Sequence, residues 1–110
     1  MRTDLDQYKW KNRILVVFVT AEGSKHWTEQ KNLFVKQADG AKSRDLLLLK
    51  NHRNKLKKPS NSNEKEPTFV MHLVGKDGSI KKVYTKPQSL NKVFDVIDAM
   101  PMRQQEMKKN

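Results

Sequence analysis

The chain has 110 residues and a formal net charge of +11, from 23 lysine and arginine residues against 12 aspartate and glutamate residues. This length suits a single domain with one modest core. Because the chain has no cysteine, disulfide bonds, thiol catalysis and cysteine-ligated metals are excluded. The positive charge favours polyanionic partners, which are nucleic acid, sulfated glycans or acidic membrane surfaces. The alternative is a domain whose many lysines are simply solvated.

The N-terminal segment is charged and lacks the apolar stretch of a signal peptide. Residues 4–13 predict a short helical turn that lays the ring of Tyr8, of Trp10 or of both against the core edge. Residues 14–19 form an unbroken apolar run, which predicts a central strand buried on both faces. This run is far shorter than the roughly 20 residues needed to cross a bilayer, so we expect no membrane span.

The next segment predicts a turn, a helix and a second strand. Ser24 is the expected N-cap of a helix over residues 25–38. One apolar stripe of this helix holds Trp27, Phe34 and Ala38, with Leu33 beside it. The Asp-Gly pair at residues 39–40 is expected to end the helix. Residues 46–49 are four leucines between turn signals, which favours a short buried strand.

Residues 50–67 differ in kind, because they are basic, rich in asparagine and proline, and contain Leu56 as their one large apolar residue. They predict a long basic loop, which is unusual in so small a domain and typical of functional or disordered segments. The residue pattern therefore directs the search for a binding site to this loop.

The C-terminal third predicts a hairpin and a helix. Residues 68–74 form a nearly continuous apolar run, which predicts a third strand in a central position, and an Asp-Gly turn at residues 75–78 leads into an edge strand over residues 80–84. Ser89 is the expected N-cap of an amphipathic helix. Leu90, Val93, Phe94, Ile97 and Met100 form its apolar face, and Pro101 kinks or ends it.

The element order is β-α-β-loop-β-β-α, which predicts a single α/β domain over residues 1–110 with its core at about 5–107. A crossover through the first helix makes the first two strands parallel. The hairpin then completes a four-stranded mixed sheet whose faces are covered by two main helices. This is the thioredoxin-like, or peroxiredoxin-like, arrangement with the basic loop in the place of the middle helix. A ferredoxin-like order is the competitor, but it requires a final strand that the sequence does not show.

Several motifs resemble one known domain. They are Tyr8-x-Trp10-x-x-Arg13, Trp27-x-x-Gln30, Val74-Gly-Lys-Asp-Gly78, Val93-Phe-Asp-Val-Ile-Asp98 and Met102-Arg-Gln-Gln-Glu-Met107. Together they look like the uncharacterised domain of equarin-type coiled-coil-containing matrix proteins, of sushi-repeat-containing proteins (as the C-terminal domain) and of small bacterial exported proteins. The likeness covers roughly residues 5–107, and its C-terminal part is the most specific.

This resemblance implies a thioredoxin-like fold that has lost its redox cysteines, with no established enzymatic activity. It also implies a secreted or extracellular location, with association to extracellular matrix in animals and export in bacteria. The chain departs from the family after the first strand, where it reads Val19-Thr-Ala-Glu-Gly23, and in residues 50–67, which lack a helix-like stretch. The second departure bears on any function that the resemblance would place on that side of the fold.

No residue set predicts catalysis, a cofactor or a metal site. Ser24 lies near His26, but no partnered base and acid accompany them, so N-capping is the preferred role. His72 lies in a buried strand and is expected to be a hydrogen-bonded core histidine. Asp95 and Asp98 are three residues apart on the last helix, which favours a solvated face or local salt bridges over acid-base chemistry.

The basic residues are the best site candidates, and they form two groups. The predicted polyanion-binding residues are Lys50, Arg53, Lys55, Lys57 and Lys58 in the loop, and Lys81, Lys82 and Lys86 after the hairpin turn. The loop has no interleaved aromatic residue on which bases could stack, which makes nucleic acid the less favoured partner. We therefore expect a non-enzymatic binding or adhesion module for glycosaminoglycan or acidic protein partners. A redox-related enzyme of peroxiredoxin-like ancestry is the alternative, which the missing cysteine disfavours.

The tail is expected to close the fold. Arg103 and Glu106 have the i, i+3 spacing of a helical ion pair. Met102 and Met107 are expected to pack back on the sheet, the alternative being an exposed methionine-rich partner surface.

Overall fold

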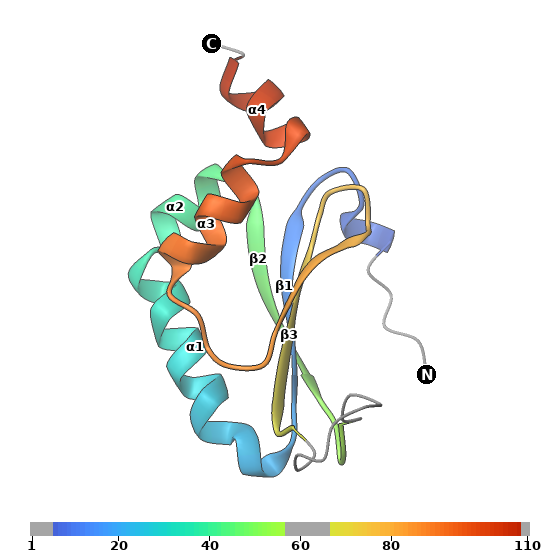
Figure 1. Cartoon of the computed structure of the whole chain (residues 1–110), viewed down its shortest axis with the longest axis vertical. Helices are drawn as coiled ribbons and strands as arrows, with labels where there is room; N and C mark the ends of the chain where they lie inside the picture. Colours follow the sequence, from blue (N-terminus) through green and yellow to red (C-terminus); the bar gives the residue numbers. More distant parts are fainter. Residues whose placement is uncertain (1–5, 57–66, 109–110) are drawn as a thin grey trace.

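The computed structural model describes residues 6–56 and 67–108. Its four-stranded mixed sheet has the order β2-β1-β3-β4 (Figure 1). The strands are β1 (Arg13–Val19), β2 (Leu46–His52), β3 (Phe69–Val74) and β4 (Ile80–Tyr84). β1 runs parallel to β2 and antiparallel to β3, and β3 runs antiparallel to β4. The predicted α/β class and mixed sheet are confirmed, as are the central positions of β1 and β3 and the edge position of β4.

The apolar composition of β1 explains its central place. Six of its seven residues are buried, and the partly buried exception is Phe18. Such a strand has no face that tolerates water, so it is stable only between two neighbouring strands and two covered faces. β2, in contrast, is an edge strand in which only Leu46 is fully buried.

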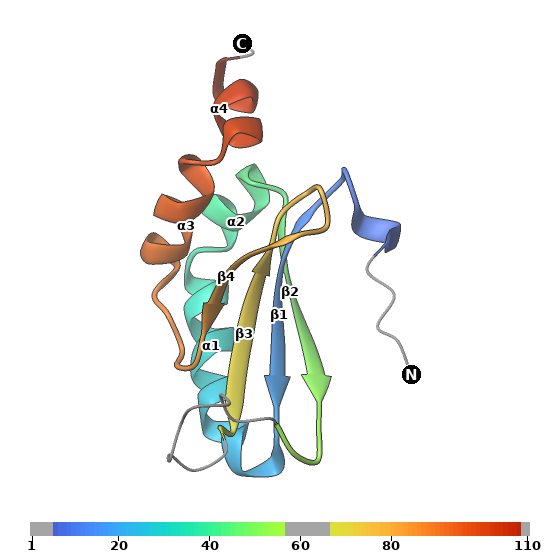
Figure 2. The ribbon, with the colours of Figure 1, turned by 45° about the vertical axis from the view of Figure 1, so that its right-hand side comes forward.

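Four α-helices lie in the described part of the chain: α1 (Ser24–Lys36), α2 (Ala38–Ser43), α3 (Leu90–Asp98) and α4 (Pro101–Lys108). Figures 1 and 2 show α1, α2 and α3 on the same side of the sheet, while α4 extends beyond its end. The expectation that the helices cover both faces is therefore wrong for these residues.

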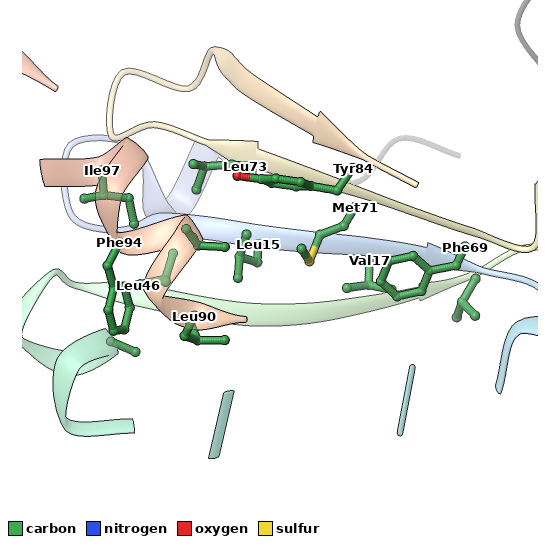
Figure 3. Close-up of a cluster of buried hydrophobic side chains, with 13 residues drawn as sticks. Leu15, Val17, Leu46, Phe69, Met71, Leu73, Tyr84, Leu90, Phe94 and Ile97 are labelled. Atoms are coloured by element: carbon green, nitrogen blue, oxygen red, sulfur yellow. The ribbon is translucent and has the colours of Figure 1, made fainter. Parts of the chain in front are cut away.

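The main core lies between the sheet and these three helices (Figure 3). Strand residues that alternate toward this face meet the apolar stripe of α3. The buried side chains labelled there are Leu15, Val17, Leu46, Phe69, Met71, Leu73, Tyr84, Leu90, Phe94 and Ile97. Each fully buried aliphatic or aromatic side chain contributes roughly 1.5–3 kcal/mol to the free energy of folding. Trp27, Leu33 and Phe34 of α1 pack against this cluster as the predicted stripe requires.

A smaller apolar cluster lies on the opposite face. Ile14, Val16 and Val74 are buried there, with Tyr8, Phe18 and Leu49 packed against them. Tyr8 belongs to a single 3-10 turn, η1 (Asp6–Tyr8), which Figures 1 and 2 show on this side of the sheet. The predicted N-terminal turn is thus confirmed for the Tyr8 ring. Trp10 remains 62% exposed, so its ring does not cover the core edge.

The helix predicted over residues 25–38 is two helices. A second 3-10 turn, η2 (Ala21–Gly23), leads into α1, so Gly23 is the N-cap and Ser24 is the first helical residue. The helix breaks at Gln37, where φ is −115° and ψ is 29°. Gly40, expected to end the helix, lies inside α2, where a Cβ atom would be 2.7 Å from Phe94 Cε2. The glycine is needed there because α2 approaches α3 closely.

The C-terminal elements follow the sequence signals more closely. Ser89 has extended backbone angles immediately before α3, although its side chain makes no capping hydrogen bond. Pro101 begins α4 rather than ending a helix, because a proline at the first helical position loses no hydrogen bond. Gly78 in the hairpin turn has a φ of 87°, as an Asp-Gly turn requires.

The predicted loop over residues 50–67 begins later than expected, because β2 continues through His52. Residues 57–66 lie outside the described part of the chain. None of the helices in the described ranges is long and apolar enough to span a membrane.

Candidate functional site

The structure separates the predicted basic residues into two places. Lys50 lies in β2, and Arg53 and Lys55 follow that strand at one edge of the sheet. Lys57 and Lys58 lie outside the described residues. Lys81 and Lys82 lie in β4, at the other edge, with two strands between them and β2. Neighbouring strands are about 4.8 Å apart, so these edges are on the order of 14 Å apart. The two groups therefore do not form one patch.

Lys50 and Arg53 are both held over aromatic rings. The Lys50 Nζ atom lies 5.5 Å from the Trp27 ring centroid, and the Arg53 Cζ atom lies 5.5 Å from the Phe18 ring centroid. Cation–π contacts of this kind contribute about 0.5–1 kcal/mol at exposed sites. Neither cation has an ion pair with a described carboxylate, so their charges remain available to a ligand.

These two side chains lie on opposite faces of the sheet. Lys50 is in register with Val17, which belongs to the helix-side core, and Phe18 belongs to the cluster on the opposite face. Because side chains alternate along a strand, Lys50 points to the helix side while Arg53 lies over the other face. The end of β2 thus presents positive charge on both sides of one edge strand.

The segment after β2 is anchored to the sheet. The Arg53 amide donates to the Val19 carbonyl at 2.9 Å, and Leu56 is buried. A cavity of about 280 Å³ opens between this segment and the sheet. Its lining residues are Phe18, Arg53, Lys55, Leu56, Val70 and His72. We call Lys50, Arg53 and Lys55 the β2-end surface.

His72 is a partly exposed residue of this cavity rather than a fully buried one. Its ring meets Phe18 edge to face with centroids 5.0 Å apart. Burial lowers the pKa of His72 below its ordinary value, so the ring is neutral at physiological pH. The expectation of a core histidine is wrong, because His72 is half-buried and lines this open cavity.

The second basic group is partly neutralised. Lys81 donates to Asp77 Oδ2 at 3.1 Å, while Lys82 and Lys86 are exposed. The backbone amide of Ser79, its hydroxyl and Lys81 all donate to Asp77 and lower the pKa of that carboxyl to about 2. Asp77 is therefore ionised at neutral pH, and its negative charge reduces the positive potential of this group.

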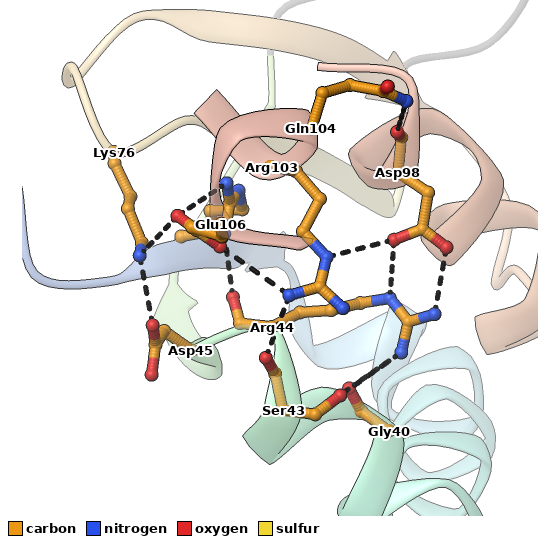
Figure 4. A network of polar contacts seen from close by, with 10 residues as sticks. Gly40, Ser43, Arg44, Asp45, Lys76, Asp98, Arg103, Gln104 and Glu106 are labelled. Atoms are coloured by element: carbon orange, nitrogen blue, oxygen red, sulfur yellow. Dashed lines mark hydrogen bonds and ion pairs between the residues drawn. The ribbon is translucent and has the colours of Figure 1, made fainter. Parts of the chain in front are cut away.

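A network of charged side chains, of which Arg13 and Lys76 are buried, occupies the opposite end of the sheet (Figure 4). Arg13, the first residue of β1, is 1% exposed and donates to both oxygens of Glu106, at 3.3 and 3.2 Å. Lys76 in the hairpin turn donates to Glu106 at 2.7 Å and to Asp45 at 2.9 Å. Partial burial raises the pKa of Glu106, but hydrogen bonds from Lys76 and Arg13 outweigh it, so the pKa is below its ordinary value.

Asp98 is the second acidic centre of this network. Arg44 donates to both of its oxygens, at 3.0 and 2.9 Å, and Arg103 donates at 3.2 Å. The hydrogen bond from Arg44 lowers the pKa of Asp98 most; burial opposes it, and Arg103 adds to the lowering. Arg44 also lies 4.0 Å from the ring centroid of Phe94. These contacts fasten α4 to α2, α3 and the sheet.

Only part of this network is predictable from the sequence. The predicted pair of Arg103 and Glu106 is present at 3.5 Å. The roles of Arg13, Arg44 and Lys76 were not predicted, although an arginine that directly precedes a fully apolar strand signals a buried cation in need of a partner. The predicted packing of Met102 and Met107 on the sheet is wrong, because they are 39% and 42% exposed.

The hairpin motif over residues 74–78 is explained by these contacts. Lys76 serves the network, Asp77 accepts from Ser79 and Lys81, and Gly78 supplies the positive φ angle. At Gly75 a Cβ atom would be 2.6 Å from Lys81 Cε. The glycine therefore allows the Lys81 side chain to pack directly against the backbone at position 75. The motif therefore places Lys76 beside α4 and pairs Asp77 with Lys81.

The remaining candidates form no reactive constellation within the described ranges. The Ser24 carbonyl accepts from the Thr28 hydroxyl, and the His26 ring lies edge-on to Phe69 with centroids 6.0 Å apart. No group of three or more histidine, aspartate or glutamate side chains that could hold a metal ion occurs in residues 6–56 and 67–108.

The chain is similar to known proteins over most of its length. Residues 4–106 match the family described as a domain of unknown function, DUF4174. A 40-residue segment of this chain is 50% identical to part of coiled-coil domain-containing protein 80 of Danio rerio. The segment makes up 36% of this chain and 5% of that relative. The chain spans only a small fraction of the length of this relative. Because the family match extends over more than half of the sequence, the chain belongs to the DUF4174 family of domains of unknown function.

Proposed function

We propose that this domain is a non-enzymatic binding module that recognises a sulfated glycan through the β2-end surface. The single observation that carries the proposal is the pair of exposed cations Lys50 and Arg53, held on opposite sides of one edge strand without an acidic partner among the described residues. A linear polyanion that crosses the end of β2 would contact both. No acidic residue occurs between positions 50 and 58, so the sequence places nothing there that would repel it.

A thioredoxin-like frame without thiol chemistry is part of this proposal. The order β2-β1-β3-β4, with a parallel first pair and an antiparallel hairpin, supports that frame. The turn between β1 and α1 holds Thr20 and Ser24 and contains no cysteine. Disulfide exchange and thiol-based peroxide reduction need a thiolate, so a redox role has no nucleophile in this chain.

A sulfated glycan is favoured over nucleic acid because cations already lie over the nearby aromatic rings. Single-stranded nucleic acid binds where bases stack on exposed aromatic faces. At the β2-end surface, the rings of Trp27 and Phe18 are approached by Lys50 and Arg53 and so are not open stacking platforms. Lysine-rich surfaces also give charge attraction rather than base readout.

The named relative, a coiled-coil domain-containing protein, shares a 40-residue segment with this chain. The sequence motifs resemble a domain of matrix-associated and exported proteins. We therefore propose an extracellular setting, in which sulfated glycans and acidic matrix proteins are abundant partners.

Heparin affinity chromatography with charge-matched variants tests this function. The triple variant Lys50→Gln, Arg53→Gln, Lys55→Gln removes the β2-end surface. Its control, Lys81→Gln, Lys82→Gln, Lys86→Gln, removes the same charge from the other edge. We expect the first variant to elute from heparin at clearly lower salt than the control, because heparin contacts the removed residues directly.

Equal elution of the two triple variants would mean that heparin binding depends only on net charge. It would rule out the β2-end surface as the glycan-binding site. Tighter binding of single-stranded DNA than of heparin at equal salt would favour the nucleic-acid alternative. Turnover of a thiol or peroxide by the purified chain would overturn the non-enzymatic role.

A further inference from the structure

A second cavity lies at the other end of the molecule, and the proposed glycan role does not use it. It has a volume of about 430 Å³ and lies between the β3–β4 hairpin and the elbow that joins α3 to α4. This volume falls within the range of roughly 300–1,000 Å³ that is typical of small-molecule sites. We call it the elbow cavity.

The two walls of the elbow cavity differ in chemistry. The elbow supplies an apolar wall from Val96, Ala99, Met100, Pro101 and Met102. The opposite wall contains the cations Arg13, Lys76 and Lys81, with Asp77 as the one acidic lining residue. A ligand that matches both walls has a negatively charged head and a short apolar body.

Arg13 has an unused side of its guanidinium group. Its Nη1 atom donates to the Arg44 carbonyl at 2.9 Å and to Glu106, and its Nη2 atom donates to Glu106. The Nε atom is buried and has no partner among the described residues. A guanidinium group can bind carboxylates on two edges, because its five donors lie in one plane. Glu106 occupies one edge, which leaves the Nε edge for a second carboxylate.

The surrounding charges leave room for one further anion. The network that contains Arg13 has four cations, Arg13, Arg44, Lys76 and Arg103, against the three carboxylates of Asp45, Asp98 and Glu106. One positive charge therefore remains uncompensated within it. In addition, the first turn of α4, which contributes Pro101 and Met102 to the cavity, contains no acidic residue to screen its positive dipole end.

We infer that the elbow cavity binds an organic carboxylate with a short apolar chain, whose head pairs with the Nε edge of Arg13 and whose chain lies on the α3–α4 elbow. The same chemistry is found in a free carboxylic acid and in the C-terminus of a peptide that ends in an aliphatic residue. Inorganic anions lack the apolar body, and neutral alcohols lack the head, so each would use only one wall.

The test is a titration of the intact chain followed by two-dimensional ¹H–¹⁵N NMR. The probes are hexanoate, N-acetyl-leucine, hexanol and inorganic phosphate. We expect saturable binding of hexanoate or N-acetyl-leucine on the order of 1 mM or tighter. The Arg13 Nε–H signal and the amides of Lys76 and Met102 should shift together. Stronger binding of hexanoate assigns the site to free acids, and stronger binding of N-acetyl-leucine assigns it to peptide ends.

The variant Ala99→Phe fills the cavity from an exposed position that makes none of the network contacts. We expect it to weaken carboxylate binding at least tenfold, whereas Ala21→Phe in η2, also exposed and far along the sheet, should leave it unchanged. Equal affinity for hexanol, equal affinity for phosphate, or full binding by Ala99→Phe would overturn the inference. Heparin elution is measured separately, because the elbow cavity and the β2-end surface share no residue.

Discussion

Arg13 and Glu106 are 93 residues apart in sequence and are joined by two hydrogen bonds of 3.3 and 3.2 Å. Arg13 begins the central strand, and Glu106 lies on the last helix. Glu106 also accepts from Lys76, so one carboxylate holds the strand, the hairpin turn and α4 together. The fixation of α4 to the domain therefore depends on charge pairing rather than on apolar packing.

Replacing Glu106 by glutamine should destabilise the fold. The substitution keeps the shape of the side chain but leaves the buried Arg13 cation and Lys76 without their shared carboxylate. Breaking such a pair costs about 3 kcal/mol, near the low end of the range for buried pairs because Glu106 is 28% exposed. Urea unfolding followed by circular dichroism measures the change. The control Glu29→Gln alters an exposed glutamate of α1 and should change stability by less than about 0.5 kcal/mol. Equal effects of the two variants would contradict the role of Glu106.

The stability of the chain should fall in acid in a way that depends on Glu106 and Asp98. Both carboxyls have a folded-state pKa below their ordinary values of 4.5 and 3.8. The unfolded chain therefore takes up protons at a higher pH than the folded chain does. The stabilisation is fully present above these ordinary values and is lost as the pH falls through the folded-state values.

The free energy of unfolding, measured by urea denaturation between about pH 5 and pH 2, checks this expectation. The double variant Glu106→Gln, Asp98→Asn should show a shallower fall than the unmodified chain. Parallel curves would show that other carboxyls cause the acid sensitivity.

Met107 should be dispensable for stability, in contrast to Ile97. Met107 is 42% exposed on α4, whereas Ile97 is fully buried in the main core. Met107→Ala should change the free energy of unfolding by less than about 0.5 kcal/mol. Ile97→Ala should cost about 2–5 kcal/mol, because it leaves a cavity in the core. Thermal and urea unfolding of both variants measure these values. A large loss in Met107→Ala would mean that the tail packs on the sheet after all.

Gly78 should tolerate asparagine better than alanine. Its φ of 87° lies in the left-handed region, which costs a residue with an ordinary side chain about 1–2 kcal/mol. Asparagine adopts this region more readily, so Gly78→Asn should lose less stability than Gly78→Ala. Equilibrium unfolding ranks the two variants. A Cβ atom at this position would meet its nearest neighbours, atoms of Lys9, at 3.6 Å, which is an ordinary contact. The reverse order of stability would therefore show that something other than backbone strain limits the choice of residue here.

The sequence predicts the sheet well because the signals are local. The apolar run of β1 has no polar face, the Asp-Gly turn joins β3 to β4, and the spacing of α3 matches one buried stripe. These patterns depend on residues within one element, so they can be recognised without knowledge of the tertiary structure. The fold class, the strand positions and α3 follow from them.

The features that the sequence does not predict depend on distant partners. Gly40 resembles a helix stop, but a glycine is required there by the close approach of Phe94, which lies 54 residues further along the chain. The partners of Arg13 lie on α4 and at the end of α2, which no local pattern shows. The basic residues form one group by composition, yet the sheet order places β2 and β4 at opposite edges. Topology, rather than composition, therefore decides which cations form a surface.

The proposed binding of a sulfated glycan to the β2-end surface can be tested directly on the intact chain. The most direct measurement is an NMR titration of the amide signals with a defined heparin oligosaccharide at physiological salt. We expect saturable shifts at Lys50, Arg53 and Lys55, and much smaller shifts at Lys81 and Lys82 on the opposite edge. Shifts of equal size at both edges, or at β4 alone, would contradict glycan binding at the β2-end surface.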